Sequence, residues 1–327
     1  MRFALRRLGF FAVTLWAALT LNFLLPRLMP GNPGLVLMAK YHGRLSPQAV
    51  KALEVAFGVN THQSLLAQYF RYLADVVTGK FGVSLYFFPE SVSRVIIDAI
   101  PWTLGMVGIT TILAFLLGTG IGIVSAWRRG GKLDSVLPPV FVITSAIPYF
   151  WVAMMLILVF SEELGWLPSA FGSDPTVTPS WTLPYLVDVL EHAILPATAL
   201  LITTIGTWIL TMRNNMVTTL AEDYVRMARA KGLPGRRIMY DYAARNAILP
   251  NLTGFAMSLG FVVSGAILIE YVFNYPGVGY MLLQAVENED FALMQALFLL
   301  ITLAVLLAIL IADIATAIFD PRTRTAG

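Results

Sequence analysis

Residues 222–250 read EDYVRMARAKGLPGRRIMYDYAARNAILP, a charged and basic segment between two long apolar stretches. Glu222 and Asp223 suit the start of a helix, because acidic groups complement the positive end of the helix dipole. Gly232 is typical of the residue just past a helix end. A second helix is predicted over about 236–248, ending before Pro250. The segment is therefore predicted to be a compact, rigid helical hairpin that docks on another protein.

The composition of the whole chain is that of a membrane protein. Of its 327 residues, 57% are hydrophobic and 13% are charged, whereas soluble domains carry about 25% charged residues. Several apolar stretches reach the roughly 20 residues that a bilayer-spanning helix needs. The absence of cysteine excludes disulfides and cysteine-based metal sites. The net charge of +3 does not indicate nucleic-acid binding, because its distribution follows the membrane.

An all-α polytopic membrane protein with six transmembrane helices is predicted. The spans are 8–28, 101–125, 136–160, 193–212, 250–273 and 291–319. Pro101 suits a first helical turn, and Pro196 and Pro250 stand near the starts of the fourth and fifth spans. Pro148 falls inside the third span and predicts a kink. A cleaved signal peptide is the alternative for residues 1–25, but no small-residue cleavage site closes the apolar run.

The basic residues indicate the orientation of the chain in the membrane. Fifteen of the 22 Lys and Arg residues fall in segments 1–7, 126–135, 213–249 and 320–327. The short loops 161–192 and 274–290 hold acidic residues and no Lys or Arg. Because cytoplasmic loops carry an excess of Lys and Arg, both termini and the 213–249 hairpin are predicted to be cytoplasmic.

The long segment between the first two spans is predicted to be helical and extracytoplasmic. Ser46 and Gly58 bound one helix, and a second pattern of apolar residues runs at helical spacing from Thr61 to Gly79. Pro89 opens a third short helix, whose apolar side holds Val92, Val95, Ile96 and Ala99. These helices are interpreted either as a solvated cap over the bundle or as a contact surface for an outer partner.

No motif for catalysis or nucleotide binding is present. The chain contains no HExxH, GxSxG or Walker A sequence. The acidic residues within the spans are Glu270 and Asp313, each near a predicted span end. They are interpreted as snorkelling or helix-capping groups rather than as the proton relay of an ion-coupled carrier. The energy for transport is expected to come from outside this chain.

Small and hydroxyl residues occur at intervals within the predicted spans. Gly118 and Gly122 have the four-residue spacing of closely packed helices, which Gly260 and Ser264 repeat. The candidates for lining a pore or gate are Thr144, Ser145, Pro148, Thr203, Thr207 and Ser258. The alternative is that these hydroxyls only bond across helices or to their own carbonyls.

The stretches Tyr224–Leu233 (YVRMARAKGL) and Arg245–Pro250 (RNAILP) resemble the EAA loop of binding-protein-dependent ABC importer permeases, of the dipeptide and oligopeptide branch. Arg226 stands where the general motif has Glu, a departure that the peptide branch tolerates. Other stretches that resemble this branch are 28–33 (LMPGNP), 147–151 (IPYFW), 164–168 (LGWLP), 272–280 (VFNYPGVGY) and 320–322 (DPR).

The resemblance implies a type I ABC importer permease fold. The expected division is 1–30 for the N-terminus and first span, 31–100 for the outer loop and 101–320 for the permease core. Expected partners are a second, homologous permease subunit, two ABC ATPase subunits, an extracytoplasmic solute-binding protein and the lipid bilayer, with no nucleic acid. ATP and Mg²⁺ would be bound by the ATPases, so no cofactor and no enzymatic activity are expected here. The implied location is a bacterial or archaeal plasma membrane.

The resemblance also implies a role for the hairpin and a class of substrate. Residues 228–233 would form the coupling helix, and the ATPase-coupling residues would be Ala228, Arg229, Ala230, Lys231, Gly232, Leu233 and Pro234. Oligopeptides or dipeptides are the implied substrates. Oligosaccharides are the alternative, since the aromatic patches 86–88 and 149–151 would stack on sugar rings unless they are interfacial belt residues. An ion-coupled secondary carrier and a purely structural membrane subunit are the rival classes.

Overall fold

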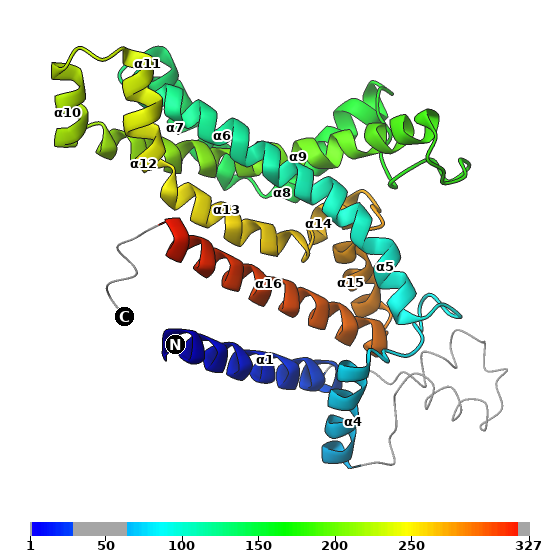
Figure 1. Ribbon diagram of the computed structural model, residues 1–327. Helices are drawn as coiled ribbons and strands as arrows, with labels where there is room; N and C mark the ends of the chain where they lie inside the picture. The colour runs from blue at the N-terminus through cyan, green and yellow to red at the C-terminus, as the bar shows by residue number, and fades with distance from the viewer. Residues whose placement is uncertain (1, 29–63, 320–327) are drawn as a thin grey trace. The chain divides into compact units, whose positions relative to one another are not determined.

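The computed structural model describes residues 2–28 and 64–319, apart from the side chains of residues 2–8, 26, 145 and 312–319 (Figure 1). Within these ranges the chain is helical, and its one isolated β-bridge joins Val83 to Ser91. The all-α prediction is therefore confirmed. The helix predicted between Ser46 and Gly58, the stretch 29–33 and the 320–322 motif lie outside the described residues.

The chain divides into two compact units. Unit 1 comprises Met1–Thr103, Val263–Ile267 and Pro276–Leu307. Unit 2 comprises Leu104–Val262, Leu268–Tyr275 and Ala308–Gly327. The predicted hairpin and the candidate pore residues Thr203, Thr207 and Ser258 lie within Leu104–Val262 and therefore belong to unit 2.

In unit 1, helix α4 (Leu65–Thr78) packs against α1 (Arg2–Leu28). Ser64 caps the start of α4, and Gly79 ends it in the left-handed conformation, with φ of 68°. The predicted stop at Gly79 is therefore confirmed, and the helix begins after Ser64 rather than at Thr61. Its Tyr69 packs edge to face on Phe23, with 5.2 Å between ring centroids.

A buried carboxylate ties the loop before α5 (Val92–Thr103) to the start of α16 (Phe291–Phe319). Asp290 accepts hydrogen bonds from Ser84 Oγ at 2.5 Å, from the Tyr86 N–H at 3.1 Å and from the Leu293 N–H at 3.1 Å. The bounds of α16 match the predicted sixth span, except that its last residues are described by backbone alone. The core of unit 1 is formed by α5, α16 and α15 (Val278–Glu287).

The segment beginning at Val92 is not a short surface helix, and this prediction is wrong. Val92, Val95, Ile96 and Ala99 are buried in the core of unit 1, so their apolar side faces protein. Helix α5 continues through the π-helical turn η1 (Leu104–Gly108) into α6 (Ile109–Trp127), making one helical stretch of 36 residues. Pro101 thus lies inside a helix rather than in a first turn.

The predicted break in the third span is confirmed. Helix α7 (Lys132–Ala146) ends before Pro148, and α8 (Tyr149–Leu156) continues into the π-helical η2 (Ile157–Glu163). The two parts are bent by more than 40° at the break. Proline accounts for the interruption because it lacks an N–H and its ring clashes with the preceding turn.

Two other boundaries differ from the predictions. Helix α9 (Leu183–Thr219) has 37 residues, so Pro196 lies well inside it rather than near its start. The fifth span is broken: α13 (Leu249–Val262) and α14 (Ile267–Val272) are separated by a turn in which Gly265 has φ of +71°. The apolar residues are continuous across this turn, so hydropathy alone predicted one helix.

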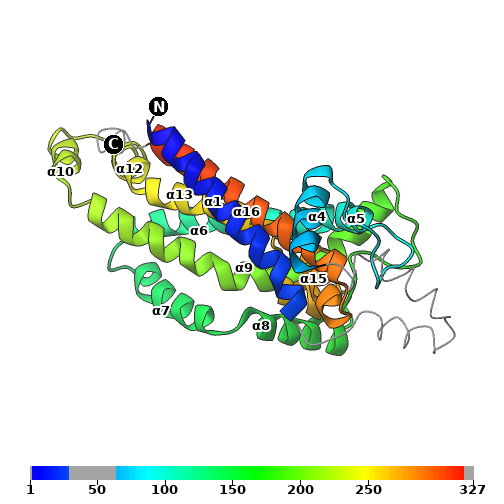
Figure 2. The same ribbon diagram turned by 90° about the horizontal axis from the view of Figure 1, so that it is seen from below.

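Helices α6 and α9 run side by side in unit 2 (Figures 1 and 2). A Cβ added at Gly118 would lie 2.6 Å from Trp208 Cβ, and one at Gly122 would lie 2.7 Å from the Ile209 carbonyl oxygen. Such distances are shorter than van der Waals contact, so the helices approach this closely only because both residues are glycine. The close-packing role predicted for this glycine pair is confirmed.

Three described helical stretches are long and apolar enough to cross a membrane: Val92–Trp127, Leu183–Thr219 and Phe291–Ile311. The broken pair α7 and α8–η2 makes a fourth if it counts as one span. Shorter apolar helices occur at Gly9–Leu25 and Leu249–Val262, where the first and fifth spans are predicted.

Candidate functional site

The predicted polar hairpin is present as a helix, a tight turn and a helical return. Helix α10 (Asp223–Ala230) ends in a turn in which the Gly232 N–H donates to the Arg229 carbonyl at 2.9 Å and the Leu233 N–H to the Ala228 carbonyl at 3.3 Å. Gly232 has φ of +72°, which glycine adopts readily and other residues rarely do. Its predicted place just past the helix end is confirmed.

The predicted start of this helix at Glu222 and Asp223 is confirmed, whereas the bounds predicted for the coupling helix are wrong. Residues 228–233 were predicted to be the coupling helix, but α10 ends at Ala230 and residues 231–234 form the turn. The hydrogen bonds at Gly232 close the helix, so it cannot continue through this position. The return consists of α11 (Gly235–Arg237), the π-helical η3 (Ile238–Ala244) and α12 (Arg245–Ala247).

The inner side of the hairpin is an apolar cluster. Val225, Ala228 and Ile238 are buried together, with Trp127 from the end of α6 packed against them. A Cβ added at Gly235 would lie 3.3 Å from Trp127 Cζ2. Trp127 also packs on a second cluster, formed by η3 and α12 with the ends of α6 and α9. Trp127 therefore links the hairpin to the helices beneath it.

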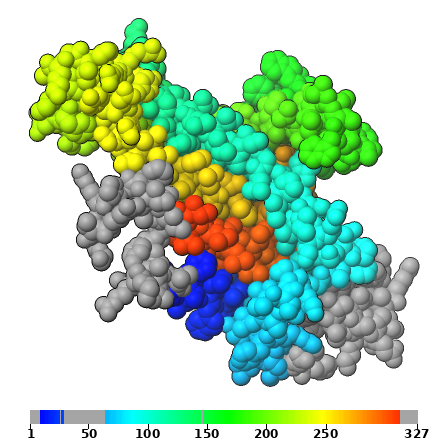
Figure 3. All heavy atoms as spheres, viewed as in Figure 1, coloured from blue at the N-terminus to red at the C-terminus, as the bar shows by residue number. Residues whose placement is uncertain are grey.

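The outer side of the hairpin is exposed and mixes apolar with basic groups. The hairpin forms a lobe at one end of unit 2 in the space-filling view (Figure 3). Met227 is 60% exposed, Tyr240 47% and Tyr224 40%. Arg226, Ala230, Lys231, Gly232, Pro234 and Arg236 are exposed as well. Such a mixture of aromatic, methionine and basic groups is typical of a surface that binds protein.

The predicted coupling residues therefore do not share one environment. Ala228 is buried in the inner cluster, and Leu233 is half-buried beside it. The Arg229 guanidinium lies 5.9 Å from the ring of Trp127, within cation–π range. Met227, Tyr224 and Tyr240 were not predicted to take part. The sequence offered one indication of these residues: they are large apolar or aromatic side chains in a segment that is otherwise polar.

An ion pair beneath the hairpin was also not predicted. Arg213 Nε of α9 donates to Asp134 Oδ1 in the first turn of α7 at 2.5 Å. The Gly130 N–H donates to the other carboxylate oxygen at 3.0 Å. The side chains are 21% and 8% exposed, so water screens this pair only in part. Asp134 was detectable in the sequence as an acidic residue among basic ones.

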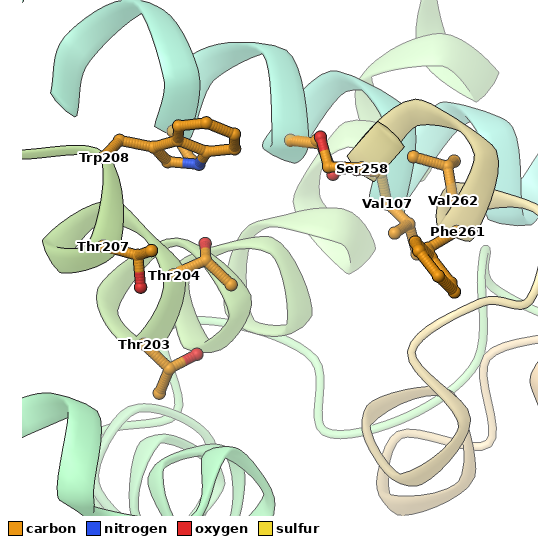
Figure 4. Close-up of a pocket in the computed structure, with 10 residues that line it drawn as sticks. Val107, Thr203, Thr204, Thr207, Trp208, Ser258, Phe261 and Val262 are labelled. Carbon is orange, nitrogen blue, oxygen red and sulfur yellow. Dashed lines mark hydrogen bonds between the residues drawn. The ribbon is translucent and has the colours of Figure 1, made fainter. Parts of the chain in front are cut away.

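A second feature of unit 2 is a cavity of about 330 Å³ between η1, α6, α9 and α13. It brings together three of the predicted pore-lining residues, Thr203, Thr207 and Ser258 (Figure 4). Thr144 and Pro148, at the break between α7 and α8, are not among its lining residues, and the Ser145 side chain is not among those described. The remaining lining residues are Val107, Thr111, Ala114, Thr204, Trp208, Phe261 and Val262.

Glu270 was predicted either to snorkel or to cap a helix; its burial makes the snorkelling prediction wrong, and the capping role stays a prediction. Glu270 of α14 is 0% exposed, and its backbone carbonyl accepts a hydrogen bond from the Tyr275 N–H at 2.7 Å. Burial, and then the Glu270 carboxylate, raise the pKa of the Tyr275 hydroxyl. Within α14 only Ile269 and Glu270 are buried, whereas Leu268 and Tyr271 are exposed, a difference that hydropathy did not predict. The side chain of Asp313 is not among those described.

The aromatic patches suggested as sugar-stacking sites do not meet in the cavity. Tyr86 packs edge to face on Phe87, with centroids 4.7 Å apart, in the loop before α5. Tyr149 and Phe150 pack on each other at the start of α8. The described residues also contain no group of three His, Cys, Asp or Glu side chains placed to hold a metal ion.

Comparison with known proteins identifies the class of this chain. Residues 118–325 match the family described as binding-protein-dependent transport system inner membrane component. The chain belongs to this family. It is a permease subunit of a transport system and not an enzyme, and it is a multi-pass protein of the bacterial plasma membrane.

Individual relatives match over nearly the whole chain. The oligopeptide transport system permease protein AppB of Bacillus subtilis is 32% identical over 302 residues, 92% of each chain. The di/tripeptide transport system permease protein DppB of Pseudomonas aeruginosa is 32% identical over 335 residues, 98% of each chain. The glutathione transport system permease protein GsiC of Escherichia coli is 30% identical over 324 residues, 99% of each chain.

Proposed function

We propose that this chain is the pore-forming subunit of an ATP-driven importer that carries dipeptides or oligopeptides into the cell. The relatives named above are permeases of oligopeptide, di/tripeptide and glutathione transport systems. Their resemblance to this chain over nearly its full length supports a peptide substrate. The proposed topology has six spans, as the apolar stretches predict, and cytoplasmic termini, as the distribution of Lys and Arg predicts.

The structure of the hairpin supports the proposal that ATP hydrolysis by a partner drives the subunit. Its inner side is packed on Trp127, whereas Tyr224, Met227 and Tyr240 face outward on a basic surface. A soluble protein that bound these exposed groups would gain apolar contact area that water now covers. The hairpin is thus suited to bind a partner protein. A movement of the bound hairpin would be transmitted to α6 through Trp127.

The proposed complex divides the work among several chains. A second, homologous permease subunit completes the pore, two ABC ATPase subunits bind ATP and Mg²⁺ and hold one hairpin each, and an extracytoplasmic binding protein delivers the peptide. The sequence contains no phosphate-binding loop, which supports this division.

The turn at Gly232 offers a direct test. Its φ of +72° strains any side chain except those of Asn and Asp, although no other atom lies within 4 Å of an added Cβ. Gly232→Val is expected to leave the chain inserted and assembled but to separate ATP hydrolysis from peptide uptake in proteoliposomes. Gly232→Asn, which tolerates this conformation, is expected to retain most uptake.

The same assay separates the alternatives. Normal peptide uptake by Gly232→Val would contradict the coupling role of the turn. Uptake of an oligosaccharide but of no peptide by the complete transporter would contradict the peptide substrate. Uptake driven by an ion gradient through this chain alone would indicate a secondary carrier.

A further inference from the structure

The cavity in unit 2 presents hydroxyls, an indole and hydrocarbon groups to its interior. None of the described residues that line it is ionisable. A charged group of a ligand that entered this open cavity would therefore lose part of its water without gaining a counter-charge, which is unfavourable. The free-energy cost of desolvation is much smaller for a neutral hydrogen-bonding group than for a charged one. The lining therefore favours the uncharged part of a ligand.

The indole of Trp208 is held in place by its neighbours. Its ring packs edge to face on Phe115, with 5.4 Å between centroids, and approaches Phe255 at 6.4 Å. A Cβ added at Gly254 would lie 3.5 Å from Trp208 Cζ3. The Nε1–H makes no hydrogen bond to any residue that the structure describes. Because an indole N–H is a donor only, Trp208 offers a fixed, unused donor.

The hydroxyls of the cavity differ in whether their hydrogens are already used. Thr204 Oγ1 donates to the Leu200 carbonyl at 2.7 Å, and Ser258 Oγ donates to the Phe255 carbonyl at 2.8 Å. Thr207 makes no side-chain hydrogen bond within the described chain and is exposed. The unused donors at the cavity therefore belong to two consecutive residues of α9, Thr207 and Trp208 (Figure 4).

We propose that this cavity is a passage subsite that holds the neutral backbone of a peptide. Peptide carbonyl oxygens accept hydrogen bonds from Trp208 Nε1 and Thr207 Oγ1. Peptide N–H groups donate to the oxygens of Thr204 and Ser258, which keep acceptor capacity while they donate to their own helices. This inference rests on the proposed function and deepens it by assigning the recognised group, the amide backbone.

The geometry agrees with transient binding of a short segment. The volume of about 330 Å³ lies at the lower end of the range for ligand pockets, roughly 300–1,000 Å³. Backbone amides are common to all peptides, so a site that reads them accepts many sequences. Hydrogen bonds between neutral groups hold such a segment weakly, and a transported molecule must bind well enough to enter yet weakly enough to leave.

Photolabelling of the complete transporter tests this proposal. The probe is an alanyl dipeptide whose second residue is the diazirine photo-leucine, supplied with the binding protein to transporter in proteoliposomes. Uptake and the sites of labelling are measured on the same preparation. Labels are expected on residues 203–208 of α9 or 258–262 of α13, and excess unlabelled dialanine is expected to reduce them.

Variants of the two donors make the test specific. Thr207→Val combined with Trp208→Phe is expected to lower labelling of the cavity and the initial uptake rate about fivefold, while ATP hydrolysis stimulated by the loaded binding protein persists. Thr203→Val is the matched comparison, because Thr203 lines the same cavity, its hydroxyl hydrogen is already used within α9 and the proposal assigns it no contact with the peptide; its effect is expected to be smaller. If the double variant does not assemble, Thr207→Val alone carries the test, since Thr207 is exposed.

The possible outcomes separate this inference from the proposed function. Labels outside the cavity in a transporter that imports the dipeptide would overturn the subsite alone. Wild-type labelling and uptake in the double variant would do the same. If the wild-type transporter imports no peptide at all, the proposed substrate is wrong. The proposed subsite is then wrong as well, because it depends on a peptide substrate.

Discussion

Arg213 of α9 donates a 2.5 Å hydrogen bond to Asp134 in the first turn of α7. The same carboxylate accepts the Gly130 N–H at 3.0 Å and the Ser125 hydroxyl at 3.4 Å. One side chain thereby joins the end of α6, the following loop, α7 and α9. Through this carboxylate, the ends of three helices beneath the hairpin are held together.

Asp134→Ala is expected to destabilise the protein by about 3 kcal/mol, because it leaves Arg213 charged and only partly exposed. Asp134→Ala combined with Arg213→Met should recover part of this loss, since no unpaired charge remains. Thermal unfolding of the purified transporter in detergent measures both. A double variant that is less stable than Asp134→Ala would show that the pair does not act as described.

Gly122→Ala is expected to destabilise the contact between α6 and α9 by about 1–3 kcal/mol. The new Cβ would lie 2.7 Å from the Ile209 carbonyl oxygen and 2.8 Å from Met212 Cβ, and the backbone there cannot move without separating the helices. Gly120→Ala is the matched control, because nothing lies within 4 Å of its Cβ. The yield of monodisperse protein and its melting temperature compare the two, and equal loss in both would contradict this packing.

Trp127→Ala is expected to loosen the hairpin by about 2 kcal/mol, less than for a fully buried tryptophan. Val225 and Ala228 would lose their partner at the end of α6. Limited proteolysis should cut within residues 222–250 faster than in the unmodified protein, and peptide uptake should fall while ATP hydrolysis persists. Trp181→Ala, at a residue that is 96% exposed, should change neither measurement. An unchanged cleavage rate in Trp127→Ala would count against Trp127 as the link.

Asp290→Ala is expected to free the loop that precedes α5. Three donors, Ser84 Oγ and the N–H groups of Tyr86 and Leu293, would lose their acceptor, at a cost of about 1–3 kcal/mol for groups left unsatisfied in a buried site. Ser84→Ala removes one of these bonds and the bond that Ser84 Oγ accepts from the Phe87 N–H at 3.0 Å, but it keeps Asp290 as the acceptor for Tyr86 and Leu293, so it should cost less. Hydrogen exchange over residues 81–91 should quicken in Asp290→Ala more than in Ser84→Ala, and equal rates would argue against Asp290 as the anchor.

Several elements follow from local sequence rules. Gly79 and Gly232 end helices because the turn after each helix requires φ near +70°, which glycine adopts readily. Pro148 interrupts a helix because it lacks an N–H. The polar hairpin between apolar stretches was equally predictable, because charge and hydropathy are properties of short segments. Three residues of the cavity, Thr203, Thr207 and Ser258, were also predictable, because each is a hydroxyl side chain within an apolar span.

Other features depend on partners distant in sequence. Glu270 is buried, and Val92 lies in the core of unit 1, although neither residue differs locally from one that lies at a membrane surface. The pairing of Asp134 with Arg213 joins residues 79 positions apart. Trp208 became a candidate only when its N–H was seen to be unused at a cavity.

The sequence by itself thus determined that this is an all-helical membrane permease with a polar hairpin. Those properties arise from hydropathy, charge and motifs that act over one helix or one turn. Only the tertiary structure decided which side of the hairpin is free, where the fifth span breaks and which hydroxyls keep a hydrogen to donate. These depend on close packing and hydrogen bonds between distant segments, which composition and periodicity do not encode.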